Sequence, residues 1–202
     1  MGIRSAFYGV VVSGALVAAG VQGIYTSISN PTPVVAACDD FNPAEQSGAW
    51  FRLSGCRIAL DEAVYFYDEK HPEKIVELYV PVRKAEGSPA RLVISSSDPQ
   101  WIAAVQDMTN FAKLGDEKYV AWHEKHLNKL QFTADVSGLM KFGVDSDDSM
   151  RMEFTKHADT LAANYGVLAH NEEPSLGLGL LLSTLGLGGF GRIGLRAVRR
   201  RG

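Results

Sequence analysis

The stretch Ala6–Tyr25, AFYGVVVSGALVAAGVQGIY, decides the fold, because its 20 residues are mostly small or branched apolar types and carry no charge. A helix rises about 1.5 Å per residue, so this stretch would span about 30 Å, the hydrocarbon thickness of a bilayer. Tyr8 and Tyr25 lie near its two ends, where amphipathic rings favour the membrane interface. The sequence therefore predicts an N-terminal transmembrane anchor over residues 1–27.

Two other interpretations of this N-terminal stretch compete with the anchor. A cleaved signal peptide would be cut after Ala18–Gly20, but the segment before the apolar run carries only Arg4, and the run is long for a signal. Val35–Cys38 (VAAC) resembles the lipobox of a lipoprotein, yet it lies well beyond the apolar run and behind two prolines. We therefore expect the anchor to stay uncleaved.

A second uncharged stretch, Ser175–Gly191 (SLGLGLLLSTLGLGGFG), lies near the other end of the chain. Its 17 residues are at the short end of the range for a membrane span, but Arg192 can extend its side chain to the interface and lengthen the usable segment. The alternative is a buried or surface-lying hairpin, because glycine weakens a helix. We expect a second transmembrane helix over residues 174–196 and a basic tail over 197–202.

The charges are segregated between the middle and the ends of the chain. All 23 acidic residues lie between Asp39 and Glu173, where 14 basic residues leave a net charge of −9, and the ends hold six arginines and no acid. Basic residues that flank membrane segments stay in the cytoplasm, so both termini are expected there. After a linker over 28–48, an acidic domain over 49–173 would then lie outside the cytoplasm, most simply at a bacterial inner membrane facing the periplasm. An acidic domain also disfavours nucleic acid as a partner.

The two cysteines of the chain, Cys38 and Cys56, both fall in this external part. In an oxidising compartment such a pair forms a disulfide, and closing their 18-residue separation would stabilise the domain by about 3 kcal/mol. The alternative is two unrelated buried thiols. Neither cysteine has the sequence context of a nucleophile, so we predict a structural Cys38–Cys56 bridge.

Short apolar runs with tight connections fill the first half of the segment between the spans. The predicted strands are Trp50–Leu53 and Arg57–Leu60 as a pair around Gly55, then Ala63–Tyr67, Ile75–Val82 and Arg91–Ser95. Pro81 implies a sheet edge or a strand end. The predicted fold class is α+β: an extracytoplasmic antiparallel meander with two or three helices, flanked by an N-terminal and a C-terminal transmembrane helix.

The apolar period then changes to about 3.6 residues, which is typical of helices. Asp98 can cap a first helix with Pro99 at its first position, and Asp116 can cap a second that ends near Leu130. The expected apolar faces are Ile102, Val105, Met108 and Phe111 in the first helix, and Val120, His123, Leu127 and Leu130 in the second. A strand at Gln131–Val136, a third helix from about Asp147 to Tyr165 and a closing strand at Val167–Ala169 complete the prediction.

Candidate chemistry is confined to His123 and His126. Two histidines three residues apart on a helix can share a metal ion, but the zinc-protease motif needs them four apart. A closed site would take further ligands from an acid or from the other histidines, His71, His157 and His170. The structural alternative packs His123 on the apolar stripe and stacks His126 near Trp122. Asp145–Asp148 lacks the glycine and glutamate of a calcium loop, so we expect helix capping there and no cofactor.

Small residues recur every four positions in both predicted spans, at Ala15, Ala19 and Gly23 in the first and at Ser175, Gly179 and Ser183 in the second. Such ladders let helix backbones approach closely in lipid. We expect the two spans to pack on each other or on a partner helix.

These observations predict a non-catalytic integral membrane protein. It would present its acidic extracytoplasmic domain for protein–protein interaction or for assembly of a membrane complex, with the bilayer and with a membrane protein or further copies of itself as partners. The alternative is a membrane-tethered metal-dependent hydrolase that uses His123 and His126. A third hypothesis is a sensor whose domain binds a small ligand and shifts the helix pair.

Overall fold

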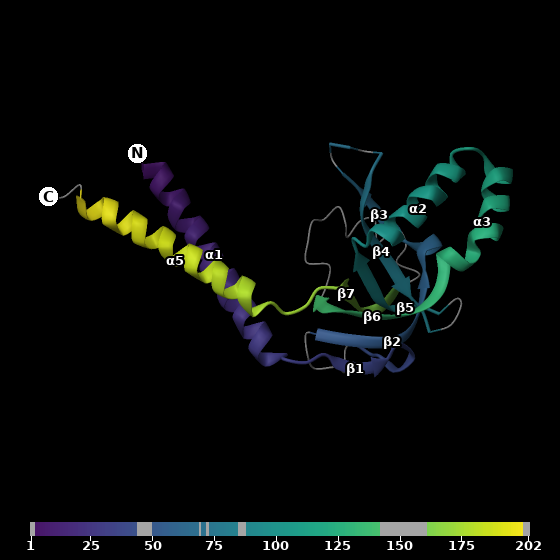
Figure 1. The fold of residues 1–202 in the computed structure, drawn as a ribbon, viewed down its shortest axis with the longest axis horizontal. Helices are drawn as coiled ribbons and strands as arrows, with labels where there is room; N and C mark the ends of the chain where they lie inside the picture. The colour runs from purple at the N-terminus through teal and green to yellow at the C-terminus, as the bar shows by residue number, and fades with distance from the viewer. Residues whose placement is uncertain are drawn as a thin grey trace. The chain divides into compact units, whose positions relative to one another are not determined.

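The computed structural model describes residues 3–43, 50–68, 70–71, 73–84, 88–141 and 161–199. They form two compact units, one from Met1–Thr32 with Pro174–Gly202 and one from Pro33–Glu173 (Figure 1). The first unit is a pair of helices, α1 (Ile3–Ser29) and α5 (Leu176–Arg199). The second unit is a sheet with helices, so the α+β class is confirmed.

Helix α1 contains an apolar run of 23 residues, Phe7–Ser29, that is long enough to cross a membrane. In the part of α5 whose side chains are described, the apolar segment Leu176–Arg192 is shorter. Residues near the end of α1 contact residues near the start of α5, which shows that the two helices run antiparallel along each other. We call this antiparallel pair the helical hairpin, although its two helices are joined in sequence by the whole second unit and not by a short turn.

The described residues of the second unit hold seven strands in one mixed sheet, in the order β1-β2-β6-β7-β5-β4-β3. Their bounds are Val34–Ala37 (β1), Trp50–Ala59 (β2), Val64–Tyr67 (β3), Ile75–Val82 (β4), Ala90–Ser96 (β5), Gln131–Lys141 (β6) and Leu161–His170 (β7). Pairs β1–β2 and β5–β7 are parallel and the others are antiparallel. The expected meander therefore describes only β3, β4 and β5, which follow one another as antiparallel neighbours.

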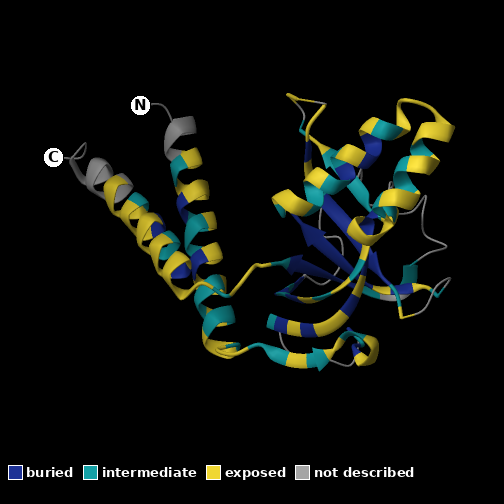
Figure 2. Cartoon of the chain, turned by 45° about the vertical axis from the view of Figure 1, so that its right-hand side comes forward, coloured by how far each residue is buried: buried dark blue, intermediate teal, exposed yellow. Residues whose placement is uncertain are grey.

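One further pairing, Ile58 of β2 with Val82 of β4, joins strands that are far apart in the sheet order. It closes β2, β6, β7, β5 and β4 into a barrel-like ring. Pro81 lies beyond the residues of β4 that pair with β3, so its missing N–H interrupts no bond to β3. Inside, the core is built mainly from aliphatic and aromatic side chains of β2, β4 and β5. Buried residues are dark blue along the ribbon in Figure 2.

The predicted hairpin around Gly55 is wrong, because β2 runs continuously from Trp50 to Ala59 along β6. Gly55 has φ +69°, and the register with β6 shifts between Leu53 and Cys56. Gly55 thus forms a bulge within the strand instead of a reversing turn. The backbone N–H of Gly55 donates to Asp135 Oδ1 on β6 at 3.0 Å, which holds this bulge in place.

Helix α2 (Pro99–Ala112) begins as predicted. Asp98 accepts from the backbone N–H groups of Gln100 and Trp101, and Pro99 occupies the first turn. Helix α3 (Asp116–Leu130) begins after Gly115, whose φ is +104°, so Asp116 lies in the first turn and is not the cap. The two helices pack together and cover part of the core, with Phe111 stacked on Trp122 at 5.1 Å between ring centres.

The predicted apolar stripe of α3 is only partly right. Leu130 is buried in the core as expected, but Val120 and Leu127 are exposed, at 52% and 41%, and Tyr119 and Trp122 pack against the core in their place. Tyr119 and Trp122 take the positions against the core because an aromatic side chain buries more area than the valine and leucine that fit the period.

The third predicted helix, from about Asp147, falls largely outside the described residues, as do Asp145–Asp148 and His157. Its expected end is wrong, because residues 161–165 belong to strand β7. Val167–Ala169 lie in the same strand, as expected, between β5 and β6. Where β7 pairs in parallel with β5, both of its faces are buried, so the neighbouring residues Val167 and Leu168 are both buried. The alternation of apolar and polar residues that signals a strand is therefore absent.

Candidate functional site

The contact between α1 and α5 is built from glycine and serine. A Cβ added to Gly20 would lie 2.5 Å from the backbone nitrogen of Ser183, and one on Gly186 would lie 2.7 Å from the carbonyl oxygen of Ser13. A Cβ on Gly179 would similarly meet the backbone nitrogen of Ile24 at 2.8 Å. These backbones are therefore as close as the absence of side chains permits, which is the packing mode of helices in lipid.

The structure divides the predicted packing ladders between the two sides of the hairpin. Gly23, Gly179 and Ser183 lie at the contact of α1 with α5. Ala15 and Ala19 are exposed on the opposite face of α1. At the contact with α5, the small residues of α1 are instead Ser13 and Gly20. Ser175 precedes α5, where its Oγ accepts from the Leu178 N–H at 3.2 Å and thus satisfies a free donor of the helix end.

The outer surface of the hairpin is apolar. The large exposed side chains include Phe7, Val11, Val12, Val21 and Ile28 on α1 and Leu178, Leu181, Leu185 and Leu187 on α5. Figure 2 shows the same distribution, with exposed residues on the outer faces of both helices. A hairpin with small residues inside and large apolar residues outside reverses the arrangement of a water-soluble helix pair.

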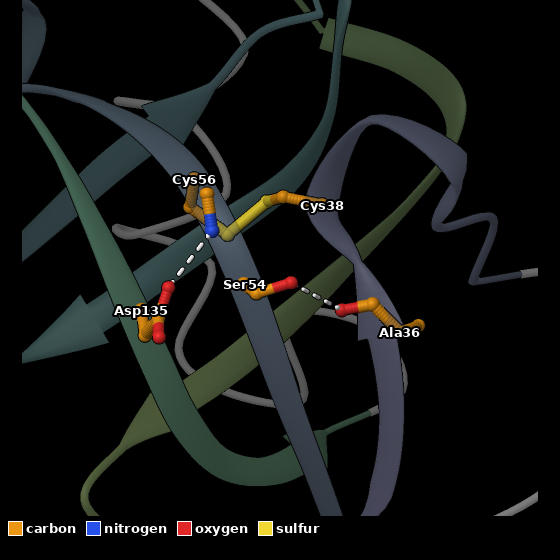
Figure 3. The surroundings of a disulfide bond; sticks show 6 residues. Ala36, Cys38, Ser54, Cys56 and Asp135 are labelled. Carbon is orange, nitrogen blue, oxygen red and sulfur yellow. Dashed lines mark hydrogen bonds between the residues drawn. A yellow bond between two sulfur atoms is a disulfide. The ribbon is translucent and has the colours of Figure 1, made fainter.

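The predicted Cys38–Cys56 disulfide is present, with Cα atoms 5.0 Å apart (Figure 3). It joins the turn after β1 to the middle of β2, one residue beyond the Gly55 bulge. Ser54 Oγ on β2 donates to the carbonyl oxygen of Ala36 on β1 at 3.5 Å beside the bridge. Cys56 is fully buried, so the disulfide fastens the short edge strand β1 to the core.

His123 and His126 are engaged with different partners. His123 Nε2 lies 3.2 Å from Asp61 Oδ2, and Gln131 Nε2 donates to the same oxygen at 2.7 Å. His126 stacks on Trp122, as we expected, and its Nδ1 lies 2.7 Å from the Trp122 carbonyl oxygen, which can only accept. In the ranges that the structure describes, no three histidine, cysteine or acidic side chains come together to hold a metal ion.

A serine–histidine contact that the sequence did not reveal joins β5 to the last strand. Ser96 Oγ and His170 Nδ1 are 2.9 Å apart, and the Asp98 N–H donates to the same hydroxyl at 3.1 Å. The His170 ring also stacks on Trp101 of α2 at 4.6 Å. Ser96 is only 2% exposed, so a substrate has no access to its hydroxyl, and the contact connects two strands and a helix without offering a nucleophile.

Burial lowers the pKa of His170, and the nearby Asp98 carboxylate opposes this shift. When the ring is neutral, its Nδ1 can accept a hydrogen bond from the Ser96 hydroxyl. Protonation of Nδ1 would remove that acceptor. His170 is thus a structural residue whose contacts depend on pH.

Basic side chains converge on a pocket of about 260 Å³ next to the disulfide. Arg57, Arg83, Lys84 and Arg91 line it together with Cys38 and with apolar side chains that include Phe41, Val82 and Leu92. A second, more polar hollow shares Arg57 and Arg83 with it. The sequence alone did not predict this basic pocket, because its four basic residues come from three separate strand regions whose register is set by long-range pairing.

Comparisons with protein family models, with curated proteins and with solved structures found no match to this chain.

Proposed function

We propose that the chain is a non-catalytic integral membrane protein with two spans, α1 and α5, that holds the Pro33–Glu173 domain outside the cytoplasm for assembly of a membrane complex. The observation that carries this proposal is the composition of the hairpin, with glycine and serine at the helix contact and large apolar side chains outside. In water that exterior would be an aggregation surface, whereas in lipid it needs no cover.

The close packing of α5 on α1 supports a second span. A spanning α1 would carry α5 with it into the hydrocarbon, because separating Gly20 from Ser183 would expose backbone that the contact now covers. The described apolar part of α5 ends at Arg192, which is exposed and long enough to reach the interface. The arginines beyond it fit the cytoplasmic side.

The Cys38–Cys56 disulfide supports an external domain. Disulfides persist in oxidising compartments, which lie on the far side of the membrane from the cytoplasm. The arginines at both termini support the same placement through the positive-inside rule, which is an argument independent of the redox chemistry.

Gln22 and the unused small-residue ladder support assembly with a further helix. Ala15, Ala19 and Gln22 are exposed on the face of α1 that lies opposite α5. An amide side chain that faces hydrocarbon leaves its hydrogen-bonding groups unsatisfied, and a partner helix can supply them across a small-residue contact. A homo-oligomer or a second membrane protein would both satisfy Gln22.

Deleting the residues after Pro174 tests the role of the hairpin in assembly. We expect the full chain to be extracted from its membrane in a complex larger than a monomer. The truncated chain should lose that complex while keeping its disulfide. Gln22→Leu should weaken the complex as well, and Val21→Leu, an exposed neighbour, serves as the control. A full chain that is monomeric in the membrane, or a truncated chain that assembles normally, would reject the proposal.

A further inference from the structure

Three arginines lie where the barrel-like ring closes, Arg57 on β2, Arg91 on β5 and Arg83 directly after the end of β4. The registers pair Ile58 with Val82 and Val82 with Leu92, which makes an apolar row of buried side chains. Continued by one residue, the same antiparallel registers bring Arg57, Arg83 and Arg91 next to one another, and all three line the same pocket. This arginine row gathers three of the five arginines between Pro33 and Glu173, in a segment whose net charge is negative.

Like charges on neighbouring strands destabilise a sheet, so this row requires compensation. Arg83 receives part of it, because its Nε donates to Glu62 Oε2 at 2.8 Å and its Nη1 donates to the Ser88 carbonyl oxygen at 2.6 Å. Within the described residues, Arg57 and Arg91 form no ion pair. Asp39 lines the same pocket, and with Lys84 present the lining still has a net positive charge.

Arg57 and Arg91 are exposed to solvent, and together with Arg83 they also line a pocket. The pocket of about 260 Å³ is slightly smaller than the roughly 300–1,000 Å³ of sites for drug-sized ligands. Phe41, Val82 and Leu92 give it apolar walls, and the arginines provide planar donors that match carboxylate or phosphate oxygens.

We infer that this pocket binds a small anionic amphiphile, a molecule with a carboxylate or phosphate group on a short apolar body. The anionic group would bind Arg57 and Arg91, with Arg83 already oriented by Glu62, and the apolar body would lie against Phe41 and Leu92. This binding activity goes beyond the proposed anchoring and assembly. It does not depend on how many membrane spans the chain has.

Hexyl phosphate, inorganic phosphate and hexanol provide the probes for a titration. The full chain is placed in phosphatidylcholine nanodiscs, with empty nanodiscs as the blank, and binding is measured by calorimetry at low salt. We expect hexyl phosphate to bind more tightly than either phosphate or hexanol, because only this probe uses both the charge and the apolar walls. Binding should weaken as salt is added.

Arg57→Gln and Arg91→Gln should each weaken hexyl phosphate binding by about tenfold or more, since each removes a charge-assisted hydrogen-bond donor. Arg52→Gln is the matched control, because Arg52 lies on the same strand β2, is exposed and does not line the pocket. Tryptophan fluorescence verifies that the variants are folded. The inference is overturned if phosphate binds as tightly as hexyl phosphate, if no probe binds, or if Arg52→Gln weakens binding equally.

Nanodiscs that contain phosphatidylglycerol distinguish the two sources of such a ligand. Competition of this lipid with hexyl phosphate would support a lipid headgroup as the occupant of the pocket. Binding of hexyl phosphate that is unchanged by the anionic lipid would support a soluble amphiphile. Because the domain stays attached to its hairpin in both experiments, loss of binding in the arginine variants is separate from loss of the membrane complex.

Discussion

Gly55 shapes the bulge of β2 through its left-handed backbone conformation. Its φ of +69° disfavours any L side chain, and no atom lies within 4 Å of a Cβ placed there. Gly55→Ala should therefore destabilise the domain by about 1–2 kcal/mol, the cost of a left-handed conformation. Gly55→Asn should cost less, because asparagine tolerates this region. Urea unfolding followed by tryptophan fluorescence measures both, since all three tryptophans belong to the Pro33–Glu173 unit.

An equal loss for the two Gly55 variants would show that the bulge does not need a left-handed residue. A smaller loss for alanine than for asparagine would show that strand propensity outweighs the conformational cost at this position.

His170 should make the domain less stable in acid. Burial lowers its folded-state pKa below the ordinary value of 6.5, so the unfolded chain binds more protons as pH falls. The stabilisation that it contributes is present above pH 6.5 and is lost as pH falls through the folded-state pKa. His170→Phe keeps a ring against Trp101 but removes the acceptor for Ser96, and it should cost about 1–3 kcal/mol at pH 7.5.

The pH dependence separates this role of His170 from simple packing. Between pH 7.5 and pH 5, the free energy of unfolding should fall less steeply for His170→Phe than for the unaltered chain. An identical slope for the two proteins would contradict the assignment, whatever the loss at neutral pH.

At the scale of whole elements, local chemistry predicted where some chain segments begin and end. The Asp98–Pro99 start of α2 and the bounds of β4 depend on neighbouring residues, and both were predictable from the sequence. Pairing was not. Gly55 makes a turn or a bulge depending on whether both halves of β2 find β6, and the arginine row exists only once β2, β4 and β5 are in register. Such partners lie tens of residues away, and local pattern carries no information about them.

The helical hairpin can be tested by a cysteine pair across α1 and α5. A Cβ on Gly189 would lie 3.3 Å from the Ser13 Cβ, close to the roughly 3.5–4.5 Å of a disulfide. Ser13→Cys with Gly189→Cys should cross-link readily in native membranes under mild oxidation. Ser13→Cys with Gly188→Cys is the control, because a Cβ on Gly188 meets no neighbouring atom within 4 Å.

Gly20 should be indispensable for this cross-link. Gly20→Leu would drive a side chain into the backbone of Ser183 and separate the helices, so the cross-link should be lost. Ala19→Leu adds the same bulk on the exposed face and should leave it unchanged. If Gly20→Leu still cross-links, α1 and α5 do not pack through these residues in the membrane.

On the scale of the whole molecule, the charge distribution and the disulfide make one prediction about topology. Reporters that are active only in the cytoplasm should work at both termini. A reporter inserted after Gly115, in the exposed turn between α2 and α3, should work only outside. Both cysteines should resist maleimide labelling until the protein is reduced, because they form the Cys38–Cys56 bridge in an oxidising compartment. The mature mass should include the N-terminal residues, which an uncleaved α1 retains.

Each departure from this expected result would contradict a different part of the proposed topology. A mature chain shortened near Ala18–Gly20 would mean that α1 is a cleaved signal, and α5 would then have no helix to pack against in the membrane. A cytoplasmic reporter active after Gly115, together with freely labelled cysteines, would instead place the domain on the inner side and remove the argument for an oxidising compartment. The arginine pocket would survive either result, because its row depends on the sheet register and not on the membrane.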